Sequence, residues 1–137
     1  MKRTKLLACL AAAALCTPAF GQTAGHEKVV AGVPASELAV SGLQVGSDGS
    51  VTGSVVNHTG AVMRDVKLLV THTWYWKNER HPGDDSPGRS GYVTLPGEIA
   101  PKGSTAFSYT PNPALPTRSD GTFQTTVSVQ SFTQVGE

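Results

Sequence analysis

The chain carries short runs of alternating apolar and polar residues, a pattern typical of β-strands. From residue 37 onward these runs are rich in Val and Thr and are separated by Gly, Pro and Asp, which favours strands joined by turns. The Asp48-Gly49 pair predicts a hairpin, because glycine adopts positive φ without penalty. The predicted strands cover residues 37–45, 51–57, 66–77, 91–95, 104–110 and 122–135.

The strand predicted over residues 66–77 indicates which side chains face the interior. Successive side chains of a strand point to opposite faces. One face has three aliphatic residues and no full charge, whereas the other has lysine at both ends. The first face consists of Val66, Leu68, Val70, His72, Trp74 and Trp76. We therefore expect both tryptophans in the core and Tyr75 toward solvent or an edge. An exposed platform of these rings, or a bulge that reverses the alternation, are the alternatives.

These elements predict an all-β protein. About six to seven short strands with no helical period favour a single antiparallel immunoglobulin-like β-sandwich. We expect this domain to occupy residues 37–137. Residues 22–36 have no sustained period and are interpreted as a leader or linker.

The first 21 residues have the pattern of a secretory signal peptide. A basic start, an apolar run too short to span a bilayer and a small-residue ending follow one another. Cleavage is expected near Gly21, which gives a periplasmic or secreted protein. A lipid anchor on Cys9 or Cys16 is not favoured, since too few apolar residues precede Cys9 and Leu15 stands before Cys16. If both cysteines leave with the signal, the mature chain has no thiol for disulfides or metals.

Removing the signal changes the charge. The loss of Lys2, Arg3 and Lys5 leaves 8 basic residues against 10 acidic ones, a net charge of −2. Because no basic cluster remains, nucleic acid and anionic membrane surfaces are not expected partners. No later apolar run reaches the length of a membrane span.

The segment over residues 78–90 is the first candidate for binding. It is long for a hairpin connection, and long ordered loops on sandwiches often carry function. Its mixed charges suit polar contacts: Arg80, His81, Asp84, Asp85 and Arg89. The alternative is a flexible connection restrained by Pro82 and Pro87.

Metal binding and catalysis receive little support from the sequence. His72 and His81 are a weak candidate pair for copper or zinc, without regular ligand spacing. Asp84 and Asp85 lack the alternating ligands of an EF-hand and, being adjacent, do not face each other across a cleft as glycosidase carboxylates do. No serine lies in a G-x-S-x-G elbow. We expect no catalytic residue and no cofactor.

Three segments together resemble a known family. "VTGSVVNHTG", "DVKLLVTHTWYW" and "LPGEIAPKGSTAFSY" resemble the FxLYD domain, a small β-sandwich of bacterial extracytoplasmic proteins. Val51, Gly53, Val55 and Asn57 match its first element, and Pro101, Gly103 and Phe107 match its last. In the namesake motif only Tyr75 matches; His72, Trp74 and Trp76 replace Phe, Leu and Asp. The resemblance covers about residues 38–129 and implies fold and compartment, but no shared chemistry.

These observations favour a non-enzymatic envelope protein. Its expected partner is another envelope protein, contacted through an edge strand or through the 78–90 loop. The alternative is a small ligand, most plausibly a glycan stacked on Trp74, Tyr75 or Trp76, which needs at least two exposed and roughly coplanar rings.

Overall fold

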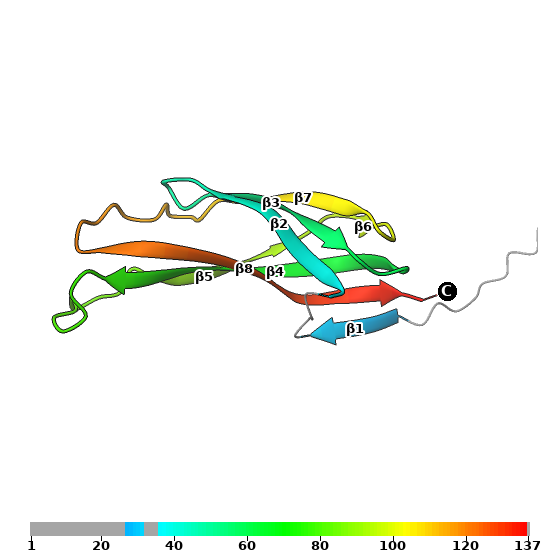
Figure 1. Cartoon of the computed structure of the whole chain (residues 1–137), viewed down its shortest axis with the longest axis horizontal. Helices are drawn as coiled ribbons and strands as arrows, with labels where there is room; N and C mark the ends of the chain where they lie inside the picture. Colours follow the sequence, from blue (N-terminus) through cyan, green and yellow to red (C-terminus); the bar gives the residue numbers. More distant parts are fainter. Residues whose placement is uncertain (1–26, 32–35, 137) are drawn as a thin grey trace, which may run out of the picture.

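The computed structural model describes residues 27–31 and 36–136, and this part of the chain folds into strands without helix. The strands form two antiparallel sheets, which lie one above the other in Figure 1. The larger sheet has the order β1 (Glu27–Ala31), β8 (Gly121–Val135), β4 (Val62–Trp76) and β5 (Arg89–Thr94), with β6 (Glu98–Ile99) also on β4. The smaller has the order β2 (Leu38–Val45), β3 (Val51–Asn57) and β7 (Ser104–Tyr109). The predicted antiparallel β-sandwich is thus confirmed.

The core lies between the two sheets and follows the predicted alternation. In β4 the side chains of Val66, Leu68, Val70, His72 and Trp74 are buried, as expected for alternating faces. Tyr75 is 47% exposed and Trp74 only 7%. The prediction is wrong in one respect: Trp76 points to the inner side but is only half-buried, because it stands at the last residue of the strand.

The long strand begins earlier than predicted because of a bulge. Its pairing with β8 shifts register between Arg64 and Leu68, and Asp65 has a φ of 52°. An extra residue reverses the alternation, so that Met63 and Val66 are both buried. The alternation that can be read from the sequence therefore starts at Val66, while the strand itself starts at Val62.

Part of the expected leader belongs to the sheet. The backbone of β1 pairs antiparallel with β8, from Glu27 opposite Val135 to Ala31 opposite Ser131. The interpretation of residues 22–36 as a leader therefore needs correction for these five residues. The sequence did not indicate this strand, because five residues are too few to show an alternating pattern. The strand forms by pairing with the edge of β8, which lies far away in the sequence. The expected signal peptide lies outside the described residues.

The turns of the smaller sheet restrain its strands. The predicted hairpin at Asp48-Gly49 is confirmed: Gly49 has a φ of 87°, and its amide donates to the Gly46 carbonyl at 3.0 Å. At the other end of β3 the buried Asn57 side chain donates to the carbonyls of Ala61, Ile99 and Ala100. The motif residue Asn57 thus joins two turns to the core.

Candidate functional site

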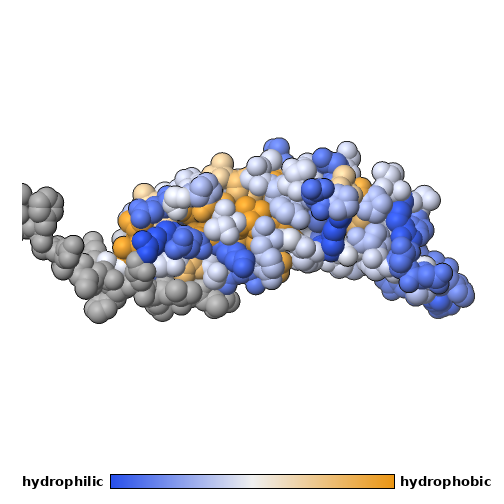
Figure 2. Space-filling model, turned by 180° about the vertical axis from the view of Figure 1, so that it is seen from behind, coloured by the Kyte–Doolittle hydropathy of each residue, from blue (hydrophilic) through white to orange (hydrophobic). Residues whose placement is uncertain are grey.

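Three connections gather at one end of the sandwich, which we call the loop end. They are the β2–β3 turn (46–50), the β4–β5 loop (77–88) and the β7–β8 loop (110–120); the last two lie together at the left of Figure 1. Leu115 joins the first and third connections, because its amide donates to the Asp48 carbonyl at 3.1 Å. Seen from behind, this end is mostly hydrophilic, while apolar residues gather toward the middle (Figure 2).

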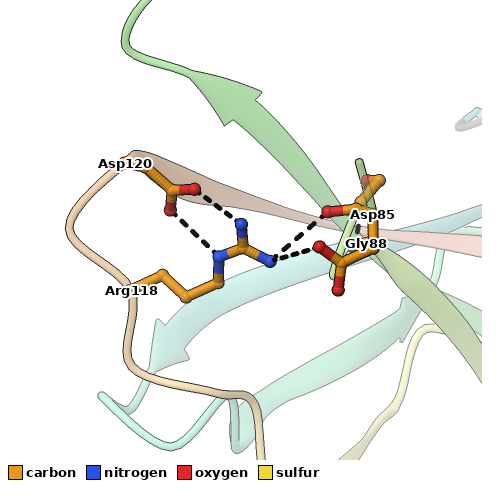
Figure 3. Close-up of polar contacts among 5 residues, drawn as sticks. Asp85, Gly88, Arg118 and Asp120 are labelled. Atoms are coloured by element: carbon orange, nitrogen blue, oxygen red, sulfur yellow. Dashed lines mark hydrogen bonds and ion pairs between the residues drawn. The ribbon is translucent and has the colours of Figure 1, made fainter. Parts of the chain in front are cut away.

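Arg118 joins the two long loops. Its Nε and Nη2 donate to the two carboxylate oxygens of Asp120, at 2.9 and 2.6 Å, and its Nη1 donates to the Asp85 carboxylate and carbonyl, both at 3.3 Å (Figure 3). A two-pronged contact of this kind fits the planar guanidinium fork. The hydrogen bond with Asp120 raises the pKa of Arg118, and the same bond lowers the pKa of Asp120. Both groups are therefore charged at neutral pH.

The same guanidinium lies close to both tryptophan rings. Its central carbon lies 5.5 Å from the ring centre of Trp74 and 5.2 Å from that of Trp76, within the range of cation–π attraction. The β4–β5 loop also approaches the Trp76 ring closely at Gly83. A Cβ added at this glycine would lie only 2.8 Å from the indole. The indoles thus hold both loops in place.

The aromatic residues do not form a flat platform. The rings of Trp74 and Trp76 meet at 87° with centres 5.9 Å apart, and Phe123 packs against Trp74 at 4.7 Å. Tyr75 points to the opposite face of the sheet. The coplanar, exposed rings that glycan stacking on Trp74, Tyr75 or Trp76 requires are therefore not present in this arrangement.

A groove of about 440 Å³ lies between the two long loops. One wall comes from Asp85, Pro87, Gly88 and Arg89, the other from Pro113, Ala114, Pro116 and Arg118. The volume is within the range of roughly 300–1,000 Å³ that is usual for ligand sites. A smaller hollow of about 270 Å³ beside it is lined by Trp74 and Arg118, among others.

Two of the five binding residues predicted from the 78–90 segment line the groove, and three do not. Asp85 and Arg89 line the groove, whereas Arg80, His81 and Asp84 are exposed and do not line it. The predicted extent of the loop is wrong at its end, since Arg89 and Ser90 already belong to β5. Arg118 and Asp120 were not among the residues predicted from the sequence. Their one local signal was the Arg-x-Asp spacing beside the prolines of "PNPALPTRSDG".

His72 occupies a different environment from His81. It is 1% exposed, its Nδ1 lies 2.8 Å from the Thr125 hydroxyl, and its Nε2 is buried without a hydrogen-bond partner. Burial, together with the nearby charge of Arg89, lowers its pKa. The described ranges contain no group of three or more His, Cys, Asp or Glu side chains that could hold a metal ion.

The fold and the site define an antiparallel β-sandwich with a groove at its loop end. The chain matches no known family model, no curated protein and no solved structure. Within residues 27–31 and 36–136, no helix is long and apolar enough to cross a membrane.

Proposed function

We propose that the protein is an exported, non-enzymatic binding domain whose loop end contacts another envelope protein. The observation that carries this proposal is the groove between residues 77–88 and 110–120, whose two walls Arg118 joins. Ordered loops presented by a rigid sandwich are a common way to build a binding surface.

The charges of the loop end favour binding over catalysis. Arg118, Asp85 and Asp120 are engaged with one another, and their pairing orders the groove walls. General acid–base catalysis needs a group whose pKa lies near the working pH. The depressed pKa of Asp120 and the raised pKa of Arg118 move both groups away from that range.

The extracytoplasmic location rests on residues 1–21 and on the resemblance to the FxLYD domain. The basic start, apolar run and small-residue ending are those of a cleaved signal. The Val51, Gly53, Val55 and Asn57 pattern adds the resemblance to a family of exported sandwiches.

Export is tested by expressing the full chain with a C-terminal tag in a Gram-negative host. We expect the tagged protein in the periplasmic fraction or the medium, with a mature N-terminus after Gly21. Intact residues 1–21 on cytoplasmic protein would refute export.

Binding at the groove is tested by site-specific photo-crosslinking in cells. A photoreactive amino acid replaces Ala114, which lines the groove, or the exposed Gln124 on the outer face of β8 as the matched control. We expect a discrete adduct with one envelope protein at Ala114 that is absent at Gln124 and is lost with Arg118→Ala. The same adducts at both positions would contradict the proposal.

A further inference from the structure

Arg89 lines the groove, and no ion pair found among residues 36–136 includes it. It is the first residue of β5 and lies opposite His72 on the inner side of the sheet. Among residues 36–136, the ion pairs beside the groove join Arg118 to Asp85 and to Asp120, and none includes Arg89. Its Nε is buried and has no hydrogen-bond partner.

The carboxylates beside the groove contact Arg118 rather than Arg89. Its ionisable lining consists of Arg89, Arg118 and Asp85. Arg118 is the cation that both Asp85 and Asp120 contact, at 3.3 and 2.6 Å, and neither carboxylate forms an ion pair with Arg89 among residues 36–136. The remaining walls are largely proline and alanine, which offer Arg89 no acceptor side chain: Pro87, Pro113, Ala114 and Pro116.

A buried donor without a partner is unfavourable, and it is strongly so when the group is charged. A carboxylate that enters the groove neutralises the cation, and its two oxygens match the guanidinium fork. The apolar walls then pack against the carbon chain that carries the carboxylate. The hydrophilic surface around this end (Figure 2) suits a polar, extended partner segment.

We propose that the groove binds a carboxylate of a protein segment, either an acidic side chain or a chain terminus, through the guanidinium of Arg89. This inference rests on the proposed function for the role of the groove, and adds the chemistry of what enters it. Arg118 acts as a positioning residue, since its own hydrogen bonds go to Asp120 and Asp85.

Binding of a carboxylate at Arg89 is expected to change the titration of His72, which NMR can follow. The ionisable groups that face His72 are Arg89 from β5 and Tyr109 from β7, whose ring lies 6.2 Å away. The Arg89 charge opposes protonation of His72. A carboxylate bound to Arg89 cancels that repulsion, so the pKa of His72 rises on binding while the burial of the ring is unchanged.

The test uses the mature protein and four probes at low salt. They are an acetylated tetrapeptide with a free C-terminus, the same peptide amidated, an amidated peptide with an internal Glu, and sodium acetate. Isothermal titration measures affinity, and NMR follows the titration of the His72 ring. We expect saturable binding of at least one carboxylate peptide and an upward shift of the His72 midpoint. The uncharged amidated peptide is expected to show no saturable binding and no shift of the His72 midpoint.

Variants locate the effect. Arg89→Gln is expected to weaken peptide binding by about tenfold or more, with Arg89→Lys between it and wild type because a lysine keeps the charge but loses the fork. Arg80→Gln, in the same loop region but away from the groove, should bind as wild type. An amide fingerprint spectrum verifies that each variant is folded, and Arg89→Lys provides the test if Arg89→Gln does not fold.

The outcomes are distinct. Equal binding of the uncharged peptide, or equal affinity of Arg89→Lys, Arg89→Gln and wild type, overturns the carboxylate site. Binding of acetate as tight as that of the peptides overturns the protein-segment source. If carboxylate binding fails while the Ala114 crosslink persists, the further inference is wrong and the proposed function stands. If the crosslink fails but the peptides bind, the envelope partner is wrong.

Discussion

The guanidinium carbon of Arg118 lies 5.2 Å from the centre of the Trp76 ring, so a cation from the β7–β8 loop stacks on the indole that ends β4. The two residues are far apart in sequence, and their contact holds the connection between the two sheets against the last residue of β4. Gly83 approaches the same indole from the β4–β5 loop. The half-buried Trp76 is therefore the centre of the loop end rather than part of the main core.

Removing the arginine should expose this indole. In Arg118→Ala the cation–π contact and the hydrogen bonds to Asp120 and Asp85 are lost together. We expect a larger iodide quenching constant for tryptophan fluorescence, because iodide gains access to Trp76. Arg80→Ala, which removes an exposed charge, is the control and should quench as wild type. Unchanged quenching in Arg118→Ala would show that the stacking does not shield the ring.

Gly121 is a position where any side chain collides with the backbone. A Cβ added there would lie 2.3 Å from the Tyr75 carbonyl oxygen and 2.5 Å from the Trp74 ring. Since these two strands pair at this point, the overlap cannot be relieved by a side-chain rotation alone. We expect Gly121→Ala to lower the free energy of unfolding by about 2 kcal/mol or more.

The matched control is Gly60→Ala. A Cβ at Gly60 would have nothing within 4 Å, so its effect should stay within about 0.5 kcal/mol. Urea unfolding followed by fluorescence compares both variants with wild type. Equal stability of the two variants would mean that β4 and β8 separate more easily at this end than their pairing indicates.

Local sequence patterns predict the strands and their faces but not the contacts between distant segments. The alternation in β4 predicted the inward side of Trp74, because strand geometry alone fixes which side chains share a face. It did not predict that Met63 is also buried, since the extra residue at the bulge near Asp65 changes the face. The predicted site included Asp85 but not its partner, because Arg118 follows 33 residues later and only the fold brings them together.

Asn57 should be among the residues most sensitive to truncation. Its side-chain nitrogen donates to three carbonyls, and its oxygen accepts from the amide and hydroxyl of Thr59 at 3.0 and 2.7 Å. Asn57→Ala removes the partner of the buried Ile99 carbonyl and of several part-buried groups, which costs about 2–4 kcal/mol in total. Asn78→Ala is the control, because the Asn78 side chain accepts one exposed hydrogen bond, from the Arg80 amide. Thermal unfolding of both variants measures the loss of stability. A small loss of stability for Asn57→Ala would indicate that water replaces the amide.

His72 should make stability depend on pH. Its pKa in the folded protein lies below the ordinary value of 6.5, first because of burial and then because of Arg89. The unfolded chain therefore binds a proton more readily than the folded one. The contribution of the neutral ring to stability is fully present above pH 6.5 and is lost as the pH falls below it, at up to about 1.4 kcal/mol per pH unit.

Urea unfolding at pH 7.5, 6.5 and 5.5 measures this dependence of stability on pH. His72→Phe, which cannot be protonated, should lose most of the slope, whereas His81→Gln in the exposed loop should keep it. An equal slope in wild type and His72→Phe would place the responsible proton elsewhere.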